Sequence, residues 1–184
     1  MNALKPLFVD LDGTLIQEDL SHLAFFYFLK NNPLKCIYHL LLFLFFGRPY
    51  LKEKISKKYT VNLAELKINQ NCIQYIKKAK NEHRGIYLIS GSHRLLVNQV
   101  KDQLKLFNEV FGTHDDFNMV GKNKIKFINK KLKIFDFDYI GNSKQDLPIW
   151  AYNKKIIYTN ISKTLEKKIQ KLNLEKIQIK EYFI

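Results

Sequence analysis

Two aspartates two residues apart, Asp10 and Asp12, follow the apolar run from Leu7 to Val9 and precede Gly13. If this run is a strand, alternate side chains point the same way, so both carboxylates lie on one face, roughly 7 Å apart. Carboxylates this close repel unless a divalent cation lies between them or one of them carries a proton. Both conditions favour phosphoryl-transfer chemistry.

The alternative for the same residues is a simple turn or a calcium loop, since Asp-x-Asp-Gly begins many of both. A calcium loop needs further oxygen ligands and a closing glutamate. The chain instead turns apolar, through Leu15 and Ile16. The sequence therefore favours a catalytic pair over a turn.

Three more polar groups follow in order. The run Gly85 to Ile89 leads into Ser90-Gly91-Ser92, where a hydroxyl and backbone amides near a helix N-terminus favour an anion. Lys124 lies at the start of a helical pattern, and Asp146 lies in the polar turn after Gly141. Each group alone is an ordinary turn, cap or surface residue. Together, each after its expected element, they are far more specific.

Strand patterns alternate with helical patterns along most of the chain, which predicts an α/β fold in which helices cover both faces of a parallel sheet. Reactive groups then gather at the carboxyl ends of the strands. The expected strands are Leu7–Asp10, Ile86–Ser90, Val110–Phe111, Tyr139–Gly141 and Ile156–Thr159. The expected helices are Asn71–Asn81, Ser92–Leu106, Lys122–Lys131, Asp146–Tyr152 and Ser162–Leu172.

Residues 18–61 break this alternation, because their pattern predicts helices and no strand. Their two apolar runs, 22–29 and 36–46, are each shorter than the ~20 residues that a membrane-spanning helix needs. We expect a helical insertion, with a core formed by 1–17 and 62–184. The second run is apolar nearly all round, so it is buried in the insertion, against a partner or in a bilayer surface. The flanking cations favour docking on an anionic membrane as a hypothesis; they are Lys30, Lys35, Arg48, Lys52 and Lys54.

Composition narrows the function classes. The net charge of +14 comes almost entirely from scattered lysines, which favours a solvated surface over a nucleic-acid partner. The two cysteines indicate no disulfide framework, and the N-terminus resembles no secretory signal, so we expect a cytoplasmic protein. Neither cysteine has an arginine six residues on, and no Gly-x-x-x-x-Gly-Lys loop is present, which excludes cysteine-dependent phosphatases and phosphate-binding-loop nucleotide hydrolases.

The ordered motifs resemble the haloacid dehalogenase-like (HAD) superfamily of phosphatases, over Leu7 to about Trp150. Within it, the chain is similar to the domain fused ahead of UbiA-type prenyltransferases and to bacterial effector phosphatases; an effector would be exported from the bacterium. The resemblance implies a three-layer, Rossmann-like fold. Eighty residues separate Asp10 from Ser90 but only 34 separate Ser90 from Lys124, so the insertion fits a cap of the first class, C1.

The resemblance also implies a role for each motif. Asp10 is the nucleophile that becomes a phosphoaspartate, and Asp12 is the general acid and base. The phosphate is held by Ser90, Gly91 and Lys124. The expected magnesium ligands are Asp10, the backbone carbonyl of Asp12, Asn142 and Asp146.

One departure concerns the metal: the family's fourth motif often begins Gly-Asp, and here it is Gly141-Asn142. An amide oxygen adds no charge, so we expect weaker metal binding. The substrate stays open between an aryl phosphate such as phosphotyrosine, in a phosphoprotein or a small phosphoester, and a lipid or polyprenyl phosphate. The aromatic residues that suggest it are Phe25, Phe26, Tyr27, Phe28 and Tyr50. A noncatalytic phosphate- or membrane-binding module is the alternative from another class.

Overall fold

The computed structural model describes residues 4–184, so the first three residues of the expected core segment 1–17 lie outside the described residues. Six parallel strands form one sheet in the order β3-β2-β1-β4-β5-β6. The strands are β1 Leu7–Val9, β2 Ile86–His93, β3 Glu109–Thr113, β4 Asp138–Gly141, β5 Lys155–Tyr158 and β6 Glu175–Gln178. The expected α/β fold is confirmed.

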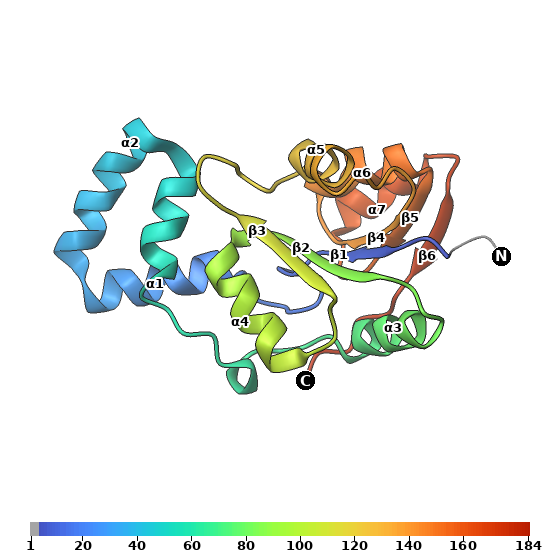
Figure 1. Cartoon of the computed structure of the whole chain (residues 1–184), viewed down its shortest axis with the longest axis horizontal. Helices are drawn as coiled ribbons and strands as arrows, with labels where there is room; N and C mark the ends of the chain where they lie inside the picture. Colours follow the sequence, from blue (N-terminus) through green and yellow to red (C-terminus); the bar gives the residue numbers. More distant parts are fainter. Residues whose placement is uncertain (1–3) are drawn as a thin grey trace.

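Helices cover both faces of this sheet (Figure 1). In the view of Figure 1, α5, α6 and α7 lie above the sheet, and α3 and α4 lie below it. The helices are α1 Leu20–Asn31, α2 Pro33–Ser56, α3 Gln70–Asn81, α4 Arg94–Leu104, α5 Lys122–Lys131, α6 Leu147–Asn153 and α7 Lys163–Gln170, with short 3₁₀ turns at Leu63–Glu65 and Lys144–Asp146.

The alternation of side chains along β1 explains these two layers. Leu7 and Val9 are fully buried in the cluster that includes α3 and α4, whereas Phe8 is buried in the cluster that includes α5, α6 and α7. A strand that is apolar on both faces belongs in the middle of such a sheet. β1 pairs with β2 and β4 in parallel register, so the residues just after β1 lie at the centre of the sheet's carboxyl edge.

Helices α1 and α2 stand apart from the sheet, beyond its carboxyl edge (Figure 1). We call this pair the cap; it lies within the expected insertion 18–61. α2 is not one continuous helix, because Gly47 has φ 76° and ψ −174°, and Pro49 follows. Asp19 caps the start of α1 by accepting a hydrogen bond from the backbone N–H of His22.

Two differences from the expected elements matter. β1 ends at Val9, so Asp10 and Asp12 lie in the turn after the strand and not on it. The edge strand β6 was not predicted, because Glu175–Gln178 contains a single apolar residue, Ile177, and an edge strand needs no apolar face.

Candidate active site

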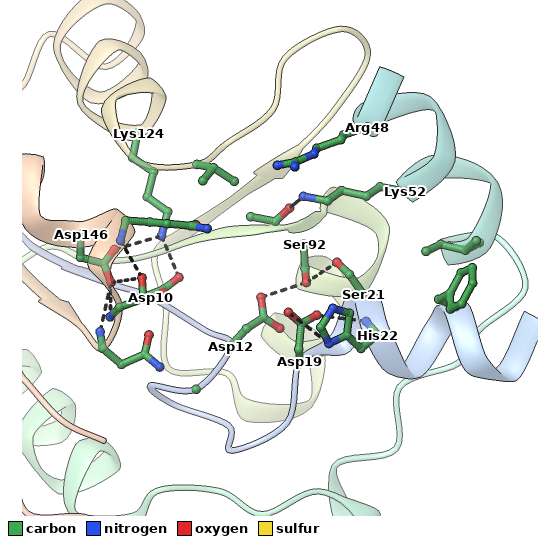
Figure 2. Close-up of a pocket in the computed structure, with 18 of the residues that line it drawn as sticks. Asp10, Asp12, Asp19, Ser21, His22, Arg48, Lys52, Ser92, Lys124 and Asp146 are labelled. Carbon is green, nitrogen blue, oxygen red and sulfur yellow. Dashed lines mark hydrogen bonds and ion pairs between the residues drawn. The ribbon is translucent and has the colours of Figure 1, made fainter. Parts of the chain in front are cut away.

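A pocket of about 710 Å³ lies between the carboxyl edge of the sheet and the cap. Its core side is formed by the loops after β1 and β4, by the end of β2 and by the start of α5, and its other side by α1 and α2 (Figure 2). Such a volume is typical of small-molecule sites. Of the expected site residues, those that line it are Asp10, Asp12, Gly91, Lys124, Asn142 and Asp146.

Asp10 forms a buried ion pair with Lys124. The Lys124 Nζ lies 2.7 Å from Oδ1 of Asp10 and 3.9 Å from Oδ1 of Asp146, and both partners in the short pair are less than a tenth exposed. The same amino group donates to the Tyr139 hydroxyl at 2.7 Å, and that hydroxyl donates to Asp146 at 2.7 Å. The network therefore fixes the positively charged amino group of Lys124 between Asp10, after β1, and Asp146, after β4 (Figure 2).

This network leaves one oxygen of Asp10 free. Within residues 4–184, no protein group hydrogen-bonds to Oδ2 of Asp10, whereas Oδ1 is held by Lys124. Burial raises the pKa of Asp10 to about 7, opposed by the charge of Lys124 and reinforced by that of Asp146. A carboxylate that is oriented through one oxygen and only weakly stabilised as an anion is suited to act as a nucleophile through the other.

Asp12 has a different set of partners. Its Oδ1 accepts a hydrogen bond from the backbone N–H of Leu20 at 2.8 Å, and its Oδ2 accepts from the hydroxyls of Ser90 at 2.7 Å and Ser92 at 2.9 Å. Burial raises the pKa of Asp12, and the nearby charge of Asp19 raises it further. A carboxyl group with a raised pKa that lines a pocket beside a nucleophile suits a general acid and base.

Asp146 organises the loop after β4. Its Oδ2 accepts hydrogen bonds from the backbone N–H groups of Asn142 and Ser143 and from the Ser143 hydroxyl, at 2.9 to 3.1 Å. Gly141 allows this close turn, because a Cβ there would lie 2.7 Å from the Asp146 carboxyl. Asn142 in turn lies over Gly13, where an added Cβ would be 2.0 Å from Nδ2 of Asn142. The loops after β1 and β4 are therefore in direct contact.

The second motif is arranged differently from the expectation. Ser90 is fully buried and does not line the pocket; its hydroxyl donates to Asp12 and accepts from the backbone N–H of Ser92. Ser92 lines the pocket instead, along with Gly91. In this structure Ser90 orients Asp12, and Ser92 is the hydroxyl that faces the cavity. Contact of Ser90 with a phosphate stays a prediction.

The cap contributes pocket residues that the sequence motifs did not identify. Ser21 shares a 3.0 Å hydrogen bond with Ser92, and the Lys52 amino group donates to the carbonyl of Gly91 at 2.5 Å and to Oδ1 of Asn118 at 3.1 Å. Burial lowers the pKa of Lys52. No local pattern marks these residues, since their place depends on how the cap packs on the core. Asp19, just before α1, also lines the pocket. The cap residues that line it are Ser21, His22, Phe25, Phe43, Arg48, Leu51, Lys52 and Ile55.

The aromatic residues proposed from the sequence to contact substrate are mostly placed elsewhere. Phe25 lines the pocket, but Phe28 is buried in the core cluster and the Tyr50 hydroxyl pairs with His39. Phe26 and Tyr27 are exposed and do not line the pocket. The second aromatic wall residue is Phe43.

The expected magnesium ligands fit a small oxygen-donor site. Asp10 and Asp146 each keep acceptor capacity on Oδ1, which leaves Oδ2 of Asp10 free, and both residues line the pocket with Asn142. The negative charge of Asp146 also raises the pKa of Asp10, so a further cation between the two would be stabilising. Within residues 4–184 no cluster of three or more acidic, histidine or cysteine side chains that could hold a metal ion occurs.

Comparisons with known proteins agree with this fold. The uncharacterized protein y4nM of Sinorhizobium fredii is 26% identical over 170 residues, which cover 92% of this chain and 33% of that protein, so the chain spans about a third of its length. A solved structure of a protein of unknown function from Bordetella pertussis Tohama I has a TM-score of 0.72 at 11% identity and covers 97% of this chain and 100% of its own.

A phospho-aspartyl intermediate analogue of a phosphoserine phosphatase has a TM-score of 0.63 at 16% identity, covering 98% of this chain and 95% of its own. At these identities the solved structures show the fold. The sequence model of haloacid dehalogenase-like hydrolases matches residues 7–150, a stretch that contains Asp10, Asp12, Ser90, Lys124 and Asp146. The chain therefore belongs to the haloacid dehalogenase-like hydrolase family.

Proposed function

We propose that the protein is a magnesium-dependent phosphomonoester phosphatase that works through a phosphoaspartate on Asp10. One observation carries this proposal: the Asp10 carboxylate is held by Lys124 through Oδ1, while Asp12, a carboxyl with a raised pKa, lines the same pocket. A nucleophile and a general acid in one pocket are what a two-step phosphate transfer requires.

In the first step, Oδ2 of Asp10 attacks phosphorus, and the bond from phosphorus to the ester oxygen breaks as Asp12 gives its proton to that oxygen. In the second step, Asp12 takes a proton from a water molecule that attacks phosphorus, and the bond to Asp10 breaks to release phosphate. Lys124 offsets the negative charge of the phosphoryl oxygens and the Gly91 amide donates a hydrogen bond to them, while the Ser90 and Ser92 hydroxyls hold Asp12. Magnesium, held by Asp10, Asp146, Asn142 and the Asp12 carbonyl, would supply further positive charge to those oxygens.

An aryl phosphomonoester such as phosphotyrosine is the proposed substrate class, because the cap places Phe25 and Phe43 on the pocket wall, where aromatic rings can stack on a phenol ring. The same wall carries Asp19, His22 and Arg48, which suit the charged groups of a phosphorylated amino acid or peptide. These charges disfavour a polyprenyl tail, which would desolvate them.

A free phosphoamino acid is the second candidate. Arg48 and Asp19 lie on one pocket and carry the charges that complement a carboxylate and an ammonium group. The fold shared with a phosphoserine phosphatase supports including phosphoserine among the substrates tested. The finer similarity to UbiA-fused domains and to effector phosphatases stays a prediction.

The test is a substrate panel with and without magnesium: p-nitrophenyl phosphate, a phosphotyrosine peptide, free phosphotyrosine, free phosphoserine and a polyprenyl phosphate. We expect turnover of the aryl phosphates, lost on chelation of the metal. Asp10→Asn should lower kcat by at least about a thousandfold, because it removes the nucleophile without changing the shape of the side chain.

Asp136→Asn is the matched control, since Asp136 is exposed and, among residues 4–184, its ion pair is with Lys5 at the surface. Full activity of Asp10→Asn would refute the phosphoaspartate mechanism. No turnover of any substrate, together with tight phosphate binding, would favour the noncatalytic module.

A further inference from the structure

The outer face of the cap carries a continuous exposed apolar stripe. On α2, six residues at helical spacing form it, and the exposed fraction reaches 82% for both Leu34 and Phe45. Each position lies three or four residues from another member of the set, so the six side chains share one side of the helix. The stripe consists of Leu34, Ile37, Tyr38, Leu41, Leu44 and Phe45.

The opposite side of the same helix makes the contacts that hold the cap together. Cys36 is fully buried, Leu40 packs against the core cluster, and Phe43 lines the pocket. The helix thus already has its internal partners, and the stripe is apolar surface beyond what the fold requires. Large exposed apolar patches on a soluble domain mark interaction surfaces.

The charges around the stripe are of one sign. Between Asp19 and Glu53 the sequence has no acidic residue, and Lys30 and Lys35 lie at the turn that joins α1 to α2, both exposed. Lys52, expected from the sequence to flank the apolar helix, instead reaches into the pocket and binds the Gly91 carbonyl. The positive charges of Lys30 and Lys35, at the end of the cap where α1 meets α2, complement an anionic surface.

We propose that the stripe docks the protein on an anionic membrane, with α2 lying in the interface and its apolar face inserted. This proposal goes beyond the phosphatase function and does not depend on it. An amphipathic helix with basic flanks binds such surfaces through buried apolar area plus attraction to acidic lipids, the latter on the order of 1 kcal/mol per basic residue. The protein would then be peripheral on the membrane, with the pocket on the inner side of the same helix.

The geometry favours a helix that lies on the bilayer over one that crosses it. By length and composition alone, α2 is long and apolar enough to span a membrane. However, its regular part before Gly47 runs from Pro33 to Phe46, about 21 Å at 1.5 Å per residue, against a hydrocarbon core of about 30 Å. Spanning would also remove Phe43 from the pocket wall.

The test is co-sedimentation of the whole chain with vesicles of phosphatidylcholine alone and of phosphatidylcholine mixed with phosphatidylserine. We expect binding to the mixed vesicles only, weakened by salt. Leu41→Ser with Phe45→Ser should weaken it by at least about tenfold, because burial of a single large apolar side chain already accounts for that factor. Lys30→Gln with Lys35→Gln should also weaken it by about tenfold or more.

Matched controls remove the same kinds of side chain elsewhere. Phe135→Ser with Tyr182→Ser changes two exposed aromatic residues outside the cap. Lys163→Gln with Lys167→Gln changes two exposed lysines of α7. Both pairs should bind like the wild type. The stripe variant should also keep the wild-type circular dichroism spectrum and cooperative thermal unfolding in the absence of vesicles, which shows that it is folded.

Three results would overturn the proposal: no sedimentation with either vesicle, equal binding to both, or equal losses in the stripe variant and its control. A concentration-dependent dimer that the stripe variant abolishes, without vesicle binding, would assign the stripe to a second copy of the chain. A tryptophan at position 45 gives an independent readout, because brominated lipids should quench Phe45→Trp and not Phe135→Trp, with the buried Trp150 as a constant background.

Discussion

The two walls of the pocket are built in different ways. On the core side, charged groups at the ends of strands are buried and joined by short hydrogen bonds from Asp10 through Lys124 and Tyr139 to Asp146. On the cap side, helices present separate side chains such as Phe25 and Arg48. Polar contacts across the two sides include the backbone N–H of Leu20 to Asp12 and Lys52 to Gly91.

This difference separates two tasks. The core network is preorganised by the sheet and leaves little freedom to its members, as the chemical step requires. The cap forms the other wall of the pocket, and its side chains can change without disturbing Asp10. Substitutions on the core side should therefore act on kcat, and substitutions on the cap side on KM or pH dependence.

The largest expected effect comes from the core network. Lys124→Met should lower kcat by about 10²- to 10³-fold, because it removes the fixed positive charge beside the phosphoryl oxygens. It should also destabilise the fold by about 3–5 kcal/mol, since Asp10 and Asp146 lose the cation between them. Unfolding titrations and steady-state kinetics measure the two effects separately.

The pH dependence of that stability loss has a defined sign. Folding raises the pKa of Asp10 from 3.8 to about 7, so the folded state holds this proton more tightly than the unfolded state. The free energy of unfolding therefore falls as the pH rises from about 3.8 to about 7. The Lys124 charge lowers that pKa, so in Lys124→Met the window of loss extends to higher pH. A stability difference from the wild type that shrinks above pH 7 would contradict the ion pair.

A smaller effect is expected from the contact between cap and core. Lys52→Met should raise KM by about tenfold and change kcat little, because Lys52 holds α2 against Gly91 and Asn118 and adds a cation to the pocket. Lys54→Met is the control, since Lys54 belongs to the same helix but does not line the pocket. A loss confined to kcat would mean that Lys52 acts in the chemical step, as the core residues do, and not in substrate binding.

Asp19 tests whether the cap tunes the general acid. Asp19→Asn removes a negative charge that raises the pKa of Asp12, so the alkaline limb of the kcat/KM profile should move to lower pH. Asparagine is an equally good helix cap, so α1 should be retained. The profile of Asp136→Asn should stay at the wild-type position. A limb that does not move, or that moves to higher pH, would exclude Asp12 as the group that titrates there.

The smallest effect concerns the metal. Asn142→Asp should lower the magnesium concentration for half-maximal rate several-fold, because an anionic ligand replaces a neutral one. Asn81→Asp, at the exposed end of α3, adds the same charge far from the pocket and should leave that concentration unchanged. An unchanged or higher requirement in Asn142→Asp would mean that this side chain does not face the metal.

Much of the core was predictable from the sequence, for a local reason. The strands β1, β2, β4 and β5 each contain a short apolar run, and polar groups follow the runs of β1, β2 and β4. β2 differs from the expectation because it continues through Ser90 and Ser92 to His93, so the next helix begins at Arg94 and not at Ser92. Because parallel strands end at one edge, their order along the chain was enough to bring Asp10, Lys124 and Asp146 together. β6 escaped prediction, because its stability comes from pairing with β5 and not from an apolar pattern.

The sequence by itself determined which groups are candidates for the chemistry, since residue type and spacing after each apolar run are local properties. Only the tertiary structure decided which groups face the cavity. Ser90 turns inward to Asp12 while Ser92 faces the pocket, and Phe43 and Lys52 come from a helix whose register against the core no local pattern encodes. The physical reason is that these orientations depend on contacts between residues far apart in the chain: Ser90 with Asp12 inside the core, and Phe43 and Lys52 with the core through the packing of the cap.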